Sequence, residues 1–265
     1  RNKAKLEEVR AKYLDDGDQA TLPIILADSG DNKSLKNLVT RTKVLCTTVG
    51  PYALYGTPVV AACVAAGTHY CDLTGEVHWM AKVIAKYQAA AQERGARIVH
   101  TCGFDSIPFD LGTWFLQDAM IKKHGVPASH IKTRVGRFSG AASGGTIASM
   151  LNMMVEANED PSIVSLMADP YALNPKHGAT GPDGADQTTA IFDPDFDKWT
   201  SPFVMAAVNT RVVRRSNALL DFLYGHDFSY DESTLSKSRY AAQSASIATR
   251  LGMLAMTITP TRKLA

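Results

Sequence analysis

The sequence predicts an α/β protein whose first part is a parallel sheet with crossover helices. Residues 44–49 form an apolar, β-branched run of strand length that stops at Gly50 and Pro51. Similar short runs alternate with helical patterns along the first half of the chain, at the spacing of strands joined by crossovers. The run 44–49 never alternates with polar residues, which predicts a strand covered on both faces.

Composition limits the other possibilities. The 265 residues are 45% hydrophobic, enough for about two domains with buried cores. A formal net charge of +2 gives no reason to expect nucleic acid or an acidic membrane surface as a partner. The four cysteines and seven histidines show no metal-ligand or disulfide spacing, so no metal is expected. We expect a cytoplasmic protein, and the sequence leaves membrane association open.

The elements of the first domain follow from periodicity and from turn residues. In order, we expect a helix over 3–13, a loop at 15–18, a strand over 23–27, a helix capped by Asn32 or Ser34, the strand 44–49, a helix from Thr57 to Gly67, a strand over 69–73, a helix to Gly95, a strand over 97–102 and a helix over 109–122. The domain division is predicted at 1–122 and 123–265.

The second domain has a more polar pattern. We expect an alternating strand over 131–138, a glycine-rich stretch 140–146 that opens a helix, a long loop over 169–197, a helix over 202–224, a strand at 227–230 and a last helix over 236–259. The loop, rich in Pro, Gly and Asp, is a candidate lid.

The carboxyl ends of parallel strands share one edge of a sheet, where ligands of such folds bind. That edge would collect Asp28 and the segments 49–52, 72–76 and 102–106. Asp28 and Asp72 could each contact a nucleotide or cap the next helix. Each could also be a solvated strand end.

Two segments at this edge carry further alternatives. Gly50, Pro51 and Tyr52 form either a plain turn or a backbone platform for a dinucleotide. In the segment 103–108, Asp105 and Ser106 could orient a substrate and relay a proton, or either could be a helix N-cap. Cys102 fits packing better than nucleophilic chemistry.

Arg211, Arg214 and Arg215 share one face of the expected helix 202–224. Guanidinium groups in this arrangement suit a carboxylate or phosphate, but also a solvated surface or an ion-pair network. The helix start at 144–146 is either an anion site or a turn.

Several motifs together resemble the saccharopine dehydrogenase-like oxidoreductases, in the branch that includes trans-acting enoyl reductases. They are RNKAKL (1–6), VGPY (49–52), YCDLTGE (70–76), GFDSIP (103–108) and NTRVVRRS (209–216). The resemblance implies a Rossmann-like domain for NADP or NAD and an α+β second domain. The family's first βαβ unit, with its glycine-rich turn, and its closing segment do not match anything in the sequence, so we expect a chain truncated at both ends.

The resemblance also assigns roles to residues. Arg1 would meet a 2′-phosphate, Asp28 would lie near the adenine, and Val49, Gly50, Pro51 and Tyr52 would lie beneath the pyrophosphate and nicotinamide. Asp72 and Gly103 complete the expected cofactor-binding residues.

We therefore predict an NAD(P)H-dependent reductase of an enoyl, acyl-lipid or imine substrate. Tyr52, Asp105 and Ser106 are the candidate proton donors, and Arg211 and Arg214 the candidate substrate ligands. The partner would be a small molecule or an acyl lipid, and a homodimer is compatible with the sequence. The alternative is a non-catalytic partner- or lipid-binding protein that uses the small, apolar face at 248–256, where core packing is the other use of such a face.

Overall fold

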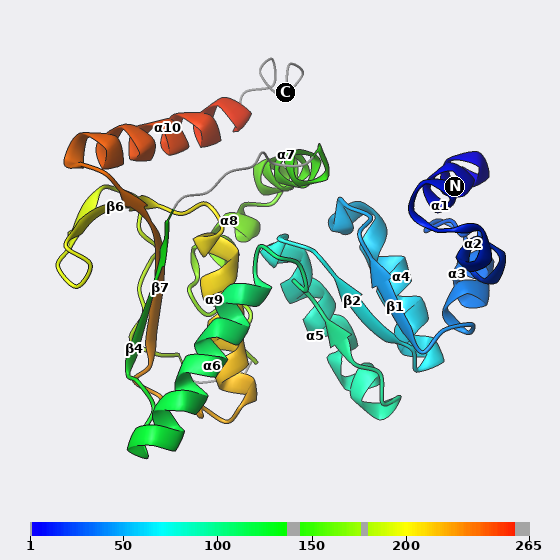
Figure 1. Ribbon diagram of the computed structural model, residues 1–265, viewed down its shortest axis with the longest axis horizontal. Helices are drawn as coiled ribbons and strands as arrows, with labels where there is room; N and C mark the ends of the chain where they lie inside the picture. The colour runs from blue at the N-terminus through cyan, green and yellow to red at the C-terminus, as the bar shows by residue number, and fades with distance from the viewer. Residues whose placement is uncertain (1, 137–143, 176–179, 258–265) are drawn as a thin grey trace. The chain divides into compact units, whose positions relative to one another are not determined.

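The computed structural model describes residues 2–136, 144–175 and 180–257 (Figure 1). The chain divides into two compact units. The first comprises Arg1–Cys71 and Val83–Val99, and the second comprises Asp72–Lys82 and His100–Ala265. The predicted domain limits, 1–122 and 123–265, stay a prediction.

The first unit contains a three-stranded sheet in the order β1-β2-β3. Its strands and crossover helices are β1 (Val44–Thr47), α4 (Tyr52–Ala66), β2 (His69–Asp72), α5 (Val77–Glu93) and β3 (Ile98–Val99), of which the last residue of β2 and the start of α5 belong to the second unit. β2 and β3 are parallel, with Tyr70 opposite Ile98. β1 runs in the same direction, because its start is bonded to the start of β2 by His69 N–H and the Lys43 carbonyl, 3.0 Å apart. The predicted mixed α/β architecture with a parallel sheet is confirmed.

The position of β1 differs from expectation. β1 is an edge strand, with Leu45 buried and Val44 51% exposed. The prediction of a strand covered on both faces is therefore wrong, because an apolar run alone does not distinguish an edge strand from a central one. Residues 23–27, also expected to be a strand, have no regular secondary structure.

Some helices of the first unit begin at residues other than those expected. α1 (Lys3–Tyr13) is as predicted, but the expected loop after it contains the start of α2 (Asp16–Thr21), which is capped by Asp15. The N-cap of α3 (Asn32–Val39) is Asp31 rather than Asn32 or Ser34.

α4 starts five residues before the expected Thr57. Pro51 is its N-cap residue, so the Gly50-Pro51 turn leads directly into the helix, and Pro58 lies inside it. α4 ends as predicted at Gly67, whose φ of 70° suits glycine. α3 and α4 pack together, and the buried side chains on them include Leu35, Val39, Val60, Cys63 and Val64.

The second unit contains a mixed sheet in the order β4-β7-β6-β5. Its strands are β4 (His130–Val135), β5 (Ile191–Asp193), β6 (Lys198–Pro202) and β7 (Ser229–Ser236). β4 and β7 are parallel, and the other pairs are antiparallel. The strands expected near 131 and 227 are present as β4 and β7. β5 and β6 were not expected; they lie within the predicted loop and at the start of the predicted helix 202–224.

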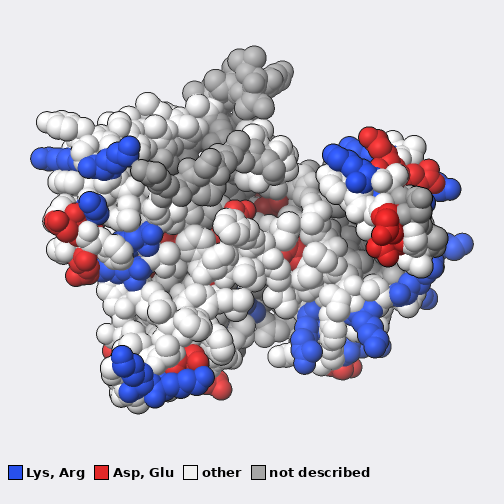
Figure 2. Space-filling model, viewed as in Figure 1, with Lys and Arg blue, Asp and Glu red and all other residues white. Residues whose placement is uncertain are grey.

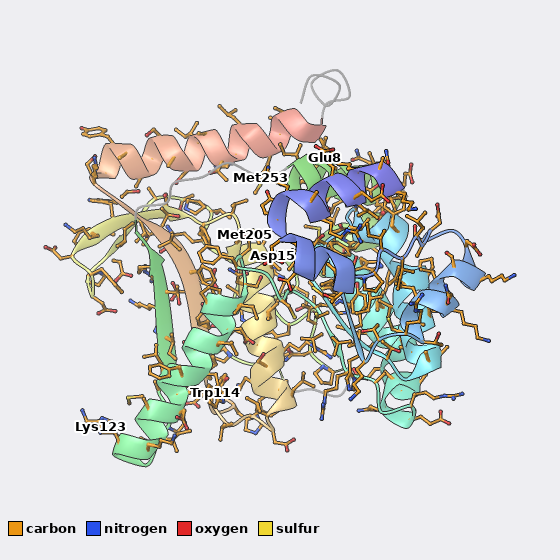
Figure 3. The ribbon with its side chains drawn as sticks, turned by 45° about the vertical axis from the view of Figure 1, so that its right-hand side comes forward. Glu8, Asp15, Trp114, Lys123, Met205 and Met253 are labelled. Carbon is orange, nitrogen blue, oxygen red and sulfur yellow. The ribbon has the colours of Figure 1, made fainter. Side chains whose placement is uncertain are left out.

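The helices of the second unit are α6 (Ile107–His124), α7 (Gly144–Glu159), α8 (Pro161–Ala168), α9 (Ala206–Leu219) and α10 (Arg239–Thr257). α9 packs on β7 and α6 packs on α9, as Figure 1 shows. Figure 3 labels Trp114 and Lys123 on α6, and Met205 at the start of α9. α8 was not expected. Most of the glycine-rich stretch 140–146 lies outside the described residues.

The core of the second unit lies between β4, β7 and α9. It consists of Ile131, Val213, Tyr224, Phe228 and Tyr230. The buried side chain of Gln117 on α6 holds the chain that leads into β4, because its amide bonds both the N–H and the carbonyl of Ala128 at 2.8 Å. α6 packs on α9, which in turn packs on β7.

Candidate functional site

The turn after β2 is joined to the turn after β3 by one carboxylate. Asp72 is fully buried, and its Oδ1 accepts the backbone N–H groups of Thr74 and Thr101, each at 3.0 Å. Its Oδ2 lies 2.7 Å from Nδ1 of His100. The alternative of a solvated strand end is therefore wrong for Asp72. Its buried carboxylate interacts with two backbone N–H groups and one imidazole.

His100 is a residue that the sequence reasoning missed. Its ring meets that of Trp79 edge to face, with centroids 5.2 Å apart, and its carbonyl accepts the Thr101 hydroxyl at 2.7 Å. The register of β2 and β3 indicates the pair of Asp72 and His100. Cys71 is opposite Val99, so the next pair in that register would be Asp72 and His100.

The segment 103–106 presents its residues in two different environments. Phe104 is 80% exposed and Asp105 is exposed, whereas Ser106 is 4% exposed. A side chain at Gly103 would lie 3.3 Å from Leu73, so glycine lets this turn pass close to the turn after β2.

Ser106 occupies the N-cap position of α6, but its side chain makes no capping bond. Its hydroxyl donates instead to Oδ1 of Asn209 on α9, at 2.7 Å. The sequence left open whether Ser106 caps α6 or orients a substrate and relays a proton. Its hydroxyl does not cap the helix.

A buried hydrogen-bond network continues from Ser106 into the sheet. Asn209 Nδ2 donates to Oε2 of Glu232 at 3.1 Å, and the Tyr230 hydroxyl donates to Oε1 at 2.7 Å. Oγ1 of Thr133 lies 3.0 Å from the Tyr230 hydroxyl. Burial raises the pKa of Glu232 to about 7, and burial also raises the pKa of Tyr230. A carboxyl group that can gain or lose a proton near neutral pH therefore lies two hydrogen bonds from Ser106.

The predicted site residues of the first unit lie around the start of α4. Val49 is exposed, Pro51 precedes the helix, and the buried Tyr52 donates its hydroxyl to the Thr47 carbonyl at 3.1 Å. Asp28 is exposed, and its carboxylate accepts Gly30 N–H at 2.8 Å rather than capping α3. Arg1 lies outside the described residues.

Arg211 and Arg214 on α9 form ion pairs within the protein, and Arg215 donates to the Leu173 carbonyl. Arg211 binds Asp186 at 2.6 Å and the Met167 carbonyl at 2.6 Å. Arg214 binds Asp183 at 2.6 Å. Both side chains are buried, so the structure shows the ion-pair network that the sequence left open as an alternative. Their role in substrate binding stays a prediction.

The structure brings together only some of the predicted site residues. Asp72 and Gly103 lie in adjoining turns of the second unit, and Ser106 is bonded to α9. A common rim with Asp28 and Gly50 would combine both units and stays a prediction. Among the described residues, no group of three or more His, Cys, Asp or Glu side chains could hold a metal ion.

Comparison with known proteins gives relatives at substantial identity, although no family model matches the sequence. A protein of Mycobacterium tuberculosis that carries the provisional name of trans-acting enoyl reductase is 45% identical over 219 residues, covering 80% of this chain and 52% of its own length. A trans-acting enoyl reductase of Mycobacterium ulcerans is 40% identical over 240 residues, covering 85% of this chain and 56% of its own length. The chain thus spans about half the length of the curated relatives it matches.

Proposed function

We propose that this chain is part of an NAD(P)H-dependent reductase that acts on an enoyl substrate, within the saccharopine dehydrogenase-like oxidoreductases. The observation that carries the proposal is the 45% identity, over 80% of the chain, to a relative with an enoyl reductase name. An enoyl group carried on an acyl lipid and an imine belong to the same proposal, because each accepts a hydride and a proton across a polarised double bond.

The first unit offers a place that suits a dinucleotide. The turn 49–51 follows a strand of a parallel sheet and leads into the 15-residue helix α4, whose N-cap residue makes no side-chain capping bond. The N-terminus of a helix favours a diphosphate. The cofactor, when bound, would supply the hydride. NADP is favoured over NAD only through the match of Arg1.

A proton must complement the hydride, and the three candidate donors differ in their surroundings. Tyr52 is buried and bonded to a backbone carbonyl. Asp105 is exposed next to Phe104. Ser106 is shielded from bulk water and backed by the Asn209–Glu232 pair. We infer that Asp105 and Ser106 orient the substrate or transfer its proton, with Tyr52 supporting the turn after β1.

We propose a small-molecule or acyl-lipid partner and a cytoplasmic location. On the face seen in Figure 2, basic and acidic side chains lie in small groups. This distribution, with a net charge of +2, gives no support for a polyanionic partner. Within the part of the chain that the structure describes, no helix has the length and apolar character needed to span a bilayer.

Titration with NADPH, followed by nicotinamide fluorescence, tests cofactor binding. Oxidation of NADPH in the presence of a short 2-enoyl thioester, followed by absorbance, tests the reaction. We expect saturable binding and substrate-dependent oxidation. No saturable binding at cofactor concentrations of up to about 1 mM, the upper end of the usual range of KM values, would refute the proposal.

A partner- or lipid-binding protein without activity is the second candidate, and α10 supports it. Ile247, Leu251 and Leu254 recur at helical spacing and are each more than half exposed, so core packing is not their use in this structure. Binding to lipid vesicles without NADPH binding would favour this candidate.

A further inference from the structure

The hydrogen-bond chain from Ser106 to β7 has a defined direction. Ser106 donates to Oδ1 of Asn209, and Nδ2 of Asn209 donates to Oε2 of Glu232. The exposed fractions of the three residues are 4%, 1% and 2%. Because bulk water has so little access to these groups, each donor and acceptor has to be satisfied inside the protein.

An amide between a hydroxyl and a carboxyl group can face in only two ways. An ionised carboxylate only accepts, so Asn209 must turn its NH2 toward Glu232 and its oxygen toward Ser106, which is the arrangement observed. A proton placed on Oε2 of Glu232 reverses both bonds. The new O–H donates to the amide oxygen, and the amide N–H then donates to Ser106 Oγ.

The reversal changes what Ser106 can do. In the observed state the Ser106 hydrogen is used by Asn209. In the reversed state Ser106 Oγ accepts from Asn209, and its O–H is available to another acceptor. Oε1 of Glu232 accepts from the Tyr230 hydroxyl in both states, so the added proton changes only the Asn209 side of the network.

We propose that Glu232 and Asn209 are positioning residues that set the direction of the Ser106 hydroxyl, and that protonation of Glu232 turns Ser106 into a hydrogen-bond donor for a bound ligand. This inference rests on the proposed function, because the ligand would be the substrate or the nicotinamide of the reductase. Ser106 is the residue that would touch the ligand, and Glu232 acts only through Asn209.

The groups around Glu232 allow both states near neutral pH. Burial raises its pKa to about 7 against the opposing hydrogen bonds from Tyr230 and Asn209. The Asp186 carboxylate also raises the pKa, and the Arg214 guanidinium lowers it. Asp186 comes from the segment before β5 and Arg214 from α9, so charges of both signs act on the carboxyl group.

The direct test follows the side-chain amide of Asn209 by NMR between about pH 5 and about pH 9, a range that extends to both sides of the Glu232 pKa of about 7. The resonances are assigned as the pair that is absent from Asn209→Leu, and Ser106→Ala provides a second assignment because it removes the bonded hydroxyl. We expect the pair to shift with a midpoint near the pKa of Glu232.

Glu232→Gln is the key variant, because glutamine keeps one acceptor and carries N–H where the protonated acid carries O–H. We expect the Asn209 pair to stay at its acid-side position at every pH in this variant. Asp231→Asn, a carboxylate change at the neighbouring position of β7, should keep the titration. An Asn209 pair that does not move in the native chain, or moves equally in Glu232→Gln, overturns the proposal.

Turnover separates this proposal from the proposed function. At about pH 8, above the pKa of Glu232, Glu232→Gln should change the rate of NADPH oxidation roughly 5-fold or more, and near pH 5 it should have little effect. In the Ser106→Ala background this change should vanish, because the two residues act through one hydrogen-bond chain. If the protein binds no NADPH, the proposed function fails, and the amide titration still decides the role of Glu232.

Discussion

Glu232 shows how a single buried carboxyl group can make stability depend on pH. Its folded pKa of about 7 exceeds the ordinary value of about 4.3, so the folded chain binds more protons than the unfolded chain between these values. The contribution of Glu232 to stability is therefore fully present below about pH 4 and is lost as the pH rises through 7.

Glu232→Gln should remove this loss. Between about pH 5 and pH 8, we expect the free energy of unfolding of the native chain to fall by about 2–3 kcal/mol relative to that of the variant. Urea unfolding at both pH values measures the difference. Asp231→Asn is the matched control, and equal pH dependence of the native chain and Glu232→Gln would contradict the expectation.

Asp72 and Asp28 provide a second comparison at the scale of the residue. The sequence presents both as aspartates at strand ends, but Asp72 is buried with two backbone N–H groups and an imidazole, whereas Asp28 is exposed with one N–H. Nothing local in the sequence distinguishes them. Burial depends on which turn packs against Asp72, and that turn is 28 residues further along the chain.

Asp72→Ala should accordingly destabilise the protein by about 2–5 kcal/mol, because the N–H groups of Thr74 and Thr101 would lose their acceptor inside the protein. Asp28→Ala should cost about 1 kcal/mol or less, since water can replace the carboxylate. Denaturant unfolding measures both values. Similar losses in the two variants would show that burial at Asp72 is not the cause.

At the scale of the element, the long helices and the strands of the first sheet could be predicted from the sequence, whereas β5, β6 and α8 were not expected. α1, α5 and α6 lie close to the ranges expected for them. β5 and β6 have three and five residues; they pair with each other, and β6 also pairs with β7, about 30 residues further along the chain. α8 did have a local signal, since Asp160 caps it and Pro161 is its first residue.

The segment between α8 and β5 is an element whose role the sequence left open. Arg211 and Arg214 hold it through Asp186 and Asp183, and Arg214 also donates to the Pro170 carbonyl at 3.1 Å. The two arginines are buried and the two aspartates are partly buried, so these ion pairs fix the segment, because breaking one leaves an uncompensated charge. A candidate lid at 169–197 would therefore have to open outside these contacts.

Arg214→Met should destabilise the protein by about 3–5 kcal/mol and speed proteolysis within this segment, because Asp183 would be left as a buried charge without its partner. The double variant Arg214→Met with Asp183→Asn should recover part of the loss. Lys122→Met, which breaks an exposed ion pair with Asp118, should cost at most about 1 kcal/mol. An Arg214→Met loss as small as that of the control would contradict the anchoring role.

At the scale of the whole molecule, local patterns indicated the parallel sheet of the first unit, but they carry no information on how distant segments meet, such as the parallel pair of β4 and β7. The candidate residues of the reductase fall into both units, with Gly50 and Tyr52 in the first and Asp72, Gly103 and Ser106 in the second. A reductase needs the cofactor and the proton donor at one place. Whether one ligand engages both units is therefore the decisive property of the whole chain.

Hydrogen exchange with and without NADPH measures that property. If the proposed function is right, saturating NADPH should slow amide exchange in residues 49–55 and in residues 101–107 with the same concentration dependence, because one bound molecule would protect both segments. Residues 191–202, which include β5 and β6, serve as an internal control and should be unaffected. Protection confined to 49–55 would show that the nucleotide binds without reaching Ser106. In that case Asp105 and Ser106 could not supply the proton, and the catalytic donor would have to be sought near α4.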